Sequence, residues 1–183
     1  MCHDAAALIA LFILGLAAQA VAIPETPTRS FWLAATYEFL ATSAFEPSSR
    51  HGFGVRGEYE FHLSPRFNLG LPLAYRMYPG EQVTQQLGYG VTLKHFFSSN
   101  WATADGVYPF VDYGLLVQQS FIQGREGSAV SHDTRLGGGV VLQSAPFSLF
   151  CDLAAHYSRL SFFDRESRAI PYVEVGAGWL FAF

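Results

Sequence analysis

Apolar and polar residues alternate with a period of two along most of this chain. The alternation is cleanest in segment 53–63, whose odd positions are mostly apolar and whose even positions are mostly charged: Phe53, Val55, Tyr59, Phe61 and Leu63 against Arg56, Glu58, Glu60 and His62. Successive side chains of a β-strand point to opposite faces, whereas an amphipathic helix needs a period of 3.6 residues. The segment is therefore predicted to be a strand with one apolar and one polar face.

Eight segments of this kind follow one another, separated by turn residues. They cover 30–45, 53–63, 67–78, 87–97, 107–121, 134–143, 148–162 and 171–183. Each is long enough for a tilted strand to cross a bilayer, which takes about 9–11 residues. Eight is also the smallest usual number of strands in a closed membrane barrel. Closure is required, because lipid offers no hydrogen-bond partner to an open sheet edge.

The connections between the segments alternate in length. Short links lie at 64–66 and 144–147, and longer links lie at 46–52, 79–86, 122–133 and 163–170. The link at 98–106 breaks the alternation, because it is long although it falls at the same end as the short links. Barrels of the bacterial outer membrane have short periplasmic turns and longer outer loops. The chain is predicted to be an all-β protein, an eight-stranded antiparallel transmembrane β-barrel of the outer-membrane type.

A soluble, lipocalin-like barrel would also alternate, but with its apolar face inward. Aromatic residues near the predicted strand ends favour the membrane, where such residues form interface girdles: Phe31, Phe53, Tyr78, Phe121, Trp179 and Phe183. Half of the residues are hydrophobic and only 14% are charged, which also favours a membrane protein. We therefore expect the bacterial outer membrane as location, with its lipid bilayer and lipopolysaccharide as partners.

The amino terminus holds the one long apolar run, residues 5–18. Ala18-Gln19-Ala20 and Ala20-Val21-Ala22 both fit the small-x-small rule for signal cleavage, so residues 1–22 are predicted to be a signal peptide and residues 23–183 the barrel domain. Cleavage after Ala20 or after Ala22 remains open. Since no Lys or Arg precedes the run, an uncleaved anchor is the alternative.

The remaining composition excludes several classes of protein. Cys2 would leave with the signal peptide, and Cys151 alone forms no internal disulfide. The net charge is −4 and the basic residues are scattered, which argues against nucleic acid as a partner. No spacing of cysteine and histidine indicates a metal site, and no cofactor is expected. The oligomeric state is left open.

By parity, one set of polar residues faces the lumen: Glu38, Arg56, Glu58, Glu60, His62, Arg76, Lys94, Asp112, Gln118, Arg135, Gln143, Asp152, His156, Ser158 and Glu174. Charges of both signs are mixed in this set. Because an eight-stranded barrel is just wide enough to be filled by its own side chains, these groups are expected to pair and to plug the lumen. An open diffusion pore would need more strands.

The last segment ends on Phe183 after strict alternation. It resembles the carboxy-terminal signal that outer-membrane assembly machinery reads, which implies that machinery as a partner.

Ala155-His156-Tyr157-Ser158 is followed by a polar loop and the final predicted strand. This arrangement resembles the PagL-type lipid A 3-O-deacylases, eight-stranded outer-membrane barrels with a His-x-Ser motif in the penultimate strand and an acidic partner on the last. The resemblance implies cofactor-free hydrolysis of an acyl ester, with Ser158 as nucleophile, His156 as base and Glu174 as acid; Glu166 is the alternative acid. Residues i and i+2 of a strand share a face, so His156 can accept the proton of Ser158.

Two features depart from that family. Arg159 stands where the family has an asparagine thought to help form the oxyanion hole, although an arginine can also stabilise an oxyanion. The family's site opens on the lipid-facing exterior, whereas parity sends His156 and Ser158 into the lumen unless a β-bulge shifts the register.

Two functions therefore compete. The first is a non-enzymatic barrel that resembles the OmpX/OmpA-type membrane domains, whose loops contact the cell surface, a ligand or a host partner. The second is the deacylase. A palmitoyl-transfer barrel would instead place polar residues at the outer rim, where Ser49, His51, Ser131, His132 and Asp133 are predicted to lie in loops; His132-Asp133 is expected to be a solvated loop end.

Overall fold

We describe a computed structural model, which defines residues 27–41, 50–80, 83–122, 128–144, 147–162 and 165–183. The predicted signal peptide, residues 1–22, lies outside the described residues. The strands are β1 (Arg29–Leu40), β2 (His51–His62), β3 (Phe67–Tyr78), β4 (Thr84–Phe96), β5 (Gly106–Ile122), β6 (Ser128–Ser144), β7 (Phe147–Phe162) and β8 (Arg165–Ala182).

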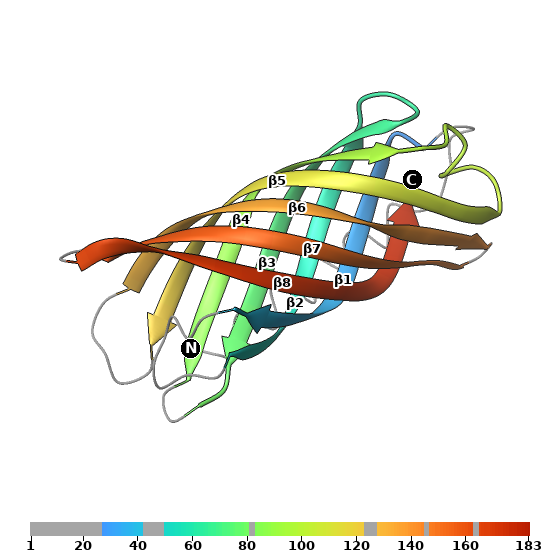
Figure 1. Cartoon of the computed structure of the whole chain (residues 1–183). Helices are drawn as coiled ribbons and strands as arrows, with labels where there is room; N and C mark the ends of the chain where they lie inside the picture. The colour runs from blue at the N-terminus through green and yellow to red at the C-terminus, as the bar shows by residue number, and fades with distance from the viewer. Residues whose placement is uncertain (1–26, 42–49, 81–82, 123–127, 145–146, 163–164) are drawn as a thin grey trace.

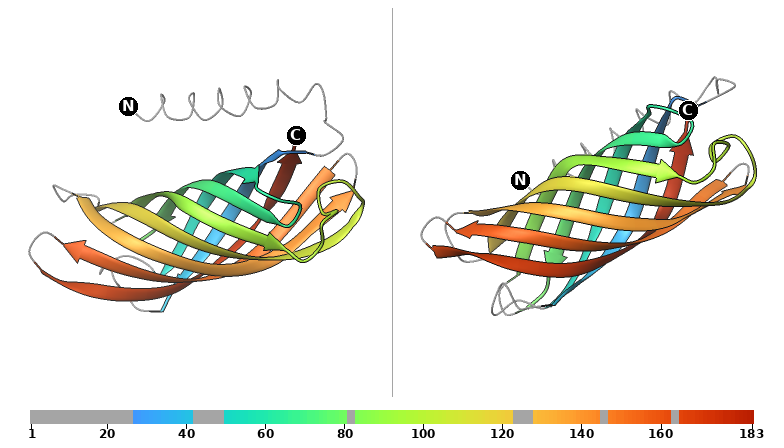
Figure 2. Two further views of the ribbon diagram at one scale, coloured as in Figure 1. Left: turned by 90° about the horizontal axis from the view of Figure 1, so that it is seen from above. Right: turned by 45° about the horizontal axis from the view of Figure 1, so that its top comes forward.

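The eight strands form one closed antiparallel barrel, as predicted (Figure 1). Each strand pairs with its neighbour in sequence, and β1 closes the barrel by pairing with β8. Beyond the ladder, Arg29 and Phe183 exchange two backbone hydrogen bonds of 3.0 and 2.9 Å. We call this the terminal end; the opposite end, where Leu40 and His51 lie, is the loop end. The β7–β8 hairpin projects at the loop end (Figure 2).

The strands at the loop end are longer than the sequence pattern indicated. β6 begins at Ser128 and β8 at Arg165, so the predicted loops 122–133 and 163–170 are wrong. The ladder between β5 and β6 continues through these polar residues, and Leu116 pairs with Asp133. Apolar alternation ends where the exterior leaves the hydrocarbon, whereas backbone pairing does not. β1 is shorter than predicted and ends at Leu40.

The exterior is apolar and the interior polar, as expected for a barrel in lipid. Leu136, Leu153 and Trp179 are 65%, 58% and 53% exposed on the outside, whereas Glu60 and Glu174 are fully buried inside. A soluble barrel has the opposite arrangement, so the lipocalin-like alternative fails. Among the residues that the structure describes, no helix is long and apolar enough to cross a membrane.

The predicted aromatic girdle is correct in part. Phe53, Phe121 and Trp179 are exposed on the exterior, but Phe31 is only 7% exposed and Tyr78 is buried in the lumen. Tyr78 was assigned to the girdle for its place near a strand end, although it shares the parity of the buried Arg76. For Tyr78, parity along the strand decides the face, and closeness to the strand end does not.

An aromatic cluster fills the lumen at the terminal end. It includes Trp32, Phe96, Phe110 and Phe150 from the strands and Trp101 from the turn between β4 and β5. The Trp101 ring stacks on Phe96 with centroids 4.0 Å apart and an interplanar angle of 4°. The unusually long link at 98–106 therefore supplies a side chain that closes this end.

Candidate functional site

The middle of the lumen holds a network of buried ion pairs. Its members are Arg56, Arg76, Lys94 and Arg135 with Glu38, Glu58, Glu60, Asp112, Asp152 and Glu174. Arg135 Nη2 lies 2.7 Å from Asp152 Oδ2, and Arg76 Nη2 lies 2.8 Å from Glu174 Oε2. Arg56 joins these two parts, because it pairs with both Asp152 and Glu174. The predicted lumen set is confirmed, with His62 and Gln143 half-buried at its edge.

Glycines in the barrel wall leave space for the side chains of this network. A Cβ on Gly176 would lie 3.3 Å from Asp152 Cγ and 3.4 Å from Arg56 Nη2, and closer still to a carboxylate oxygen of Asp152. A Cβ on Gly139 would come within 2.9 Å of Asp152 Cα. The glycine run 137–139 therefore permits close packing of the barrel wall.

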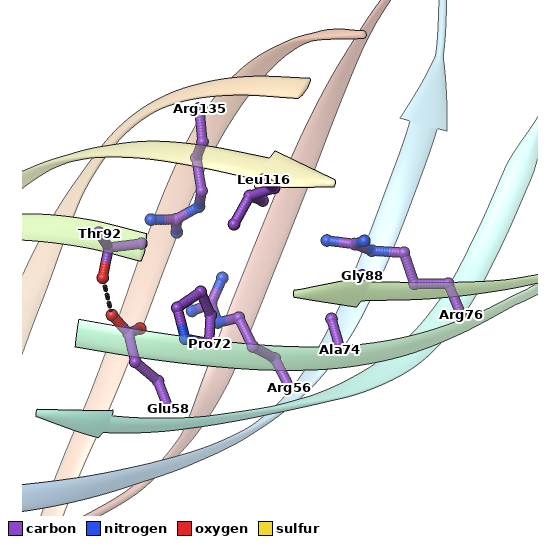
Figure 3. Close-up of a pocket in the computed structure, with 9 residues that line it drawn as sticks. All are labelled: Arg56, Glu58, Pro72, Ala74, Arg76, Gly88, Thr92, Leu116 and Arg135. Carbon is purple, nitrogen blue, oxygen red and sulfur yellow. Dashed lines mark hydrogen bonds between the residues drawn. The ribbon is translucent and has the colours of Figure 1, made fainter. Parts of the chain in front are cut away.

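Little space remains between the charged groups. Three arginine side chains, Arg56, Arg76 and Arg135, surround a central cavity with a volume of about 10 Å³, room for a single water molecule (Figure 3). On its wall, Thr92 Oγ1 donates a hydrogen bond to Glu58. The described part of the lumen is therefore packed by its own side chains at this level.

A second polar cluster lies towards the loop end and is centred on Asp133. Its Oδ2 atom accepts hydrogen bonds from Gln118 Nε2 at 2.8 Å and Tyr172 Oη at 2.7 Å, and lies 2.7 Å from His156 Nδ1. The His156 ring stacks on Tyr172, with centroids 4.3 Å apart. The expectation that His132-Asp133 is a solvated loop end is wrong, because Asp133 is 2% exposed within β6. The shared parity of Asp133 and Arg135 was the signal in the sequence.

The predicted catalytic residues lie on the lumen side of β7 and β8. His156 and Ser158 are 3% and 4% exposed, and the one register shift recorded between β7 and β8 falls beyond them, at Leu160/Phe162. Glu174 accepts hydrogen bonds from Arg56 and Arg76. The side chain of Glu166 lies outside the described residues.

The carboxylate within hydrogen-bond distance of His156 is that of Asp133, whereas Glu174 binds Arg56 and Arg76. Ser158 stands directly opposite Asp133 in the β6–β7 register, and His156 precedes it by two residues on the same face. Arg159 is exposed on the exterior, the other side of β7 from Ser158. The structure thus brings His156 and Ser158 together with an acid for which the sequence pattern predicts a loop position; their catalytic roles stay a prediction.

A small cavity adjoins this cluster. Ser158 lines it together with Gln118, Ser131 and Tyr172, and its volume is about 10 Å³. Ser131 Oγ on its wall, and Asp133 Oδ1 and His156 Nε2 in the adjoining cluster, are buried without a hydrogen-bond partner among the residues that the structure describes. A water molecule can satisfy such groups. Within the described residues, no group of three or more His, Cys, Asp or Glu is placed to hold a metal ion.

Comparison with known proteins supports the fold. No family model and no curated protein matches the sequence. Among solved structures, Neisserial surface protein A superposes with a TM-score of 0.62 at 16% identity, covering 85% of this chain and 97% of that chain. The amino-terminal barrel domain of OprF from Pseudomonas aeruginosa gives 0.52 at 15% identity, covering 85% and 100%.

The outer-membrane enzyme PagL gives a TM-score of 0.51 at 13% identity, covering 80% of this chain and 97% of that chain. At these identities the likeness concerns the fold and not the chemistry. The fold and the apolar exterior are together those of a small eight-stranded β-barrel of the bacterial outer membrane.

Proposed function

We propose that this protein is a small, non-enzymatic outer-membrane barrel with a self-plugged lumen, and that it acts as a structural, surface or interaction protein. Residues 1–22 would serve as the signal peptide for the barrel domain 23–183. The observation that carries the proposal is the packing of the lumen, in which buried arginines and carboxylates neutralise one another around a cavity of about 10 Å³. A conducting pore needs a continuous path for water, and such packing interrupts it.

Both ends of the lumen support the same reading. Trp101 and its aromatic neighbours fill the terminal end. Towards the loop end, Leu40, Tyr78 and Tyr172 belong to a second cluster of buried side chains. An interaction function would then reside on the outside of the barrel and in the loops.

Conductance measurements test the closed lumen. Protein extracted in its folded form from outer membranes, inserted into planar lipid bilayers, is expected to give no steady ionic current. The variant Trp101→Gly removes one of the two tryptophan side chains of the terminal-end cluster and is the matched comparison. Stable, stepwise conductance from the parent protein would contradict the proposal.

The second candidate function is hydrolysis of an acyl ester of lipid A. It is favoured by one observation, the placement of His156 beside the carboxylate of Asp133 and two residues before Ser158 on the same face of β7. In this reading His156 Nε2 takes the proton of Ser158 Oγ, which attacks the ester carbonyl carbon. The alcohol leaves with that proton, and water then releases the acyl group from the serine. Asp133 would orient the imidazole in place of Glu174.

Mass spectrometry of lipid A separates the two candidates. Lipid A is incubated with the folded parent protein, with Ser158→Ala and with Ser120→Ala, which removes a buried lumen hydroxyl that binds Gln86 instead. Under the first proposal all three leave lipid A unchanged. Loss of an acyl chain with the parent and Ser120→Ala, but not with Ser158→Ala, would establish the esterase and refute the first proposal.

A further inference from the structure

Two basic side chains stand side by side on the outside of the barrel near the loop end. The β6–β7 register places His132 directly opposite Arg159, and both are exposed. Their chain neighbours Asp133 and Ser158 are buried, so His132 and Arg159 project away from the lumen. Side chains directly opposite one another on adjacent strands have Cβ atoms about 5 Å apart, close enough to hold one ligand group together.

The position of this pair along the barrel axis follows from the uncharged exterior residues that lie between it and the terminal end. Towards the terminal end, every exterior position of β7 from Tyr157 to Leu149 is uncharged: Tyr157, Ala155, Leu153, Cys151 and Leu149. Arg159 is ten residues from Leu149, and His132 is ten residues from Leu142 on β6. Ten steps of about 3.3 Å at a strand tilt of about 40° amount to roughly 25 Å, the height of the apolar band of such barrels. The pair therefore lies where hydrocarbon gives way to lipid headgroups.

Tyr157 supports this placement. It precedes Arg159 on the same face and is 56% exposed. Tyrosine is enriched at the boundary between the hydrocarbon and the headgroups, because its ring is apolar and its hydroxyl polar. Arg159 is the next exterior residue beyond that boundary.

The chemistry of the pair selects an anion. A guanidinium group presents parallel N–H donors that match the oxygens of a phosphate, and a histidine ring adds a further donor. We propose that Arg159 and His132 form a binding site on the outside of the barrel for the phosphate group of an anionic membrane lipid. The site is independent of whether the lumen is inert or catalytic, because it faces the other side of β7.

Native mass spectrometry in a neutral detergent tests the site. The folded protein is titrated with short-chain phosphatidic acid and, separately, with phosphatidylcholine of the same chain length. The first phosphatidic acid molecule is expected to bind at least about tenfold more tightly than phosphatidylcholine. Arg159→Gln should weaken its binding roughly tenfold, and His132→Gln by a smaller factor, since charge-assisted hydrogen bonds are lost. Arg66→Gln, in the turn at the terminal end, should leave it unchanged.

Arg159→Lys is the second test variant, since it keeps the charge but loses the paired donors; it should bind with an affinity between those of the parent and Arg159→Gln. All variants are compared only after their heat-modifiable gel mobility shows a folded barrel. Equal affinity of the parent, Arg159→Gln and Arg159→Lys would overturn the proposal, as would an equal loss in Arg66→Gln. Displacement of the lipid by millimolar inorganic phosphate would show a site for the free ion and would also overturn it.

Discussion

Replacing Arg135 by methionine tests whether the lumen network stabilises the barrel. Arg135 is 2% exposed and pairs with Asp112 and Asp152. Asp152 keeps Arg56 as a partner after the change, whereas Asp112 loses the one ion pair that the described residues give it. Removing one member of a buried pair typically costs about 3–5 kcal/mol, because the remaining charge is left unpaired. Arg135→Met should lower the free energy of unfolding by this amount.

The double variant Arg135→Met/Asp112→Asn isolates the cause. It removes the unpaired charge of Asp112 with almost no change of shape. It should therefore be more stable than Arg135→Met alone by about 2 kcal/mol, a value within the range of coupling energies between residues in contact. Equilibrium unfolding in urea, in lipid vesicles and followed by tryptophan fluorescence, gives these values. Arg66→Met removes an arginine from the exposed turn after β2 and should change stability by less than about 0.5 kcal/mol.

Two results would refute the reasoning. If the free energy of unfolding of Arg135→Met lies within about 1 kcal/mol of that of the parent, the network is hydrated enough that removing one charge destabilises it little. If the double variant is no more stable than the single variant, the loss arises from packing and not from the unpaired carboxylate.

Two further substitutions and one quenching experiment test the same structure. Trp101→Ala should lower stability by about 3–5 kcal/mol in the same unfolding assay, since a buried indole is lost from the terminal-end cluster; a loss below about 1 kcal/mol would contradict its role there. Gly176→Ala should cost about 1–3 kcal/mol because the new methyl group meets the carboxylate of Asp152. Gly57→Ala, on the exterior, is its control and should cost less, because the nearest atom to its new methyl group is Phe31 Cζ, 3.3 Å away. Brominated lipid should quench Trp179, which is 53% exposed, but not the two other tryptophans, which are buried; undiminished emission of the parent protein would argue against a lipid-facing β8.

The extent of the pairing between β6 and β7 explains why the candidate site was predicted only in part. His156 and Ser158 were correctly expected in the lumen, because parity along β7 is a local property. Asp133 was missed, since its polar stretch lacks apolar residues on the exterior and resembles a loop. Only the continued pairing of β6 with β7 shows that Asp133 lies beside His156.

The sequence by itself determined the fold class, the number of strands and the face of most residues in the apolar part of each strand, because side chains alternate along every β-strand regardless of its partners. It did not determine which lumen groups meet. Arg56 pairs with Asp152 and Glu174, which are 96 and 118 positions away in the chain. Those contacts depend on the register and tilt with which the sheet closes on itself, and these follow from the hydrogen bonds of all eight strands together. The tertiary structure alone decided the ion pairs, the acid beside His156 and the pairing of His132 with Arg159.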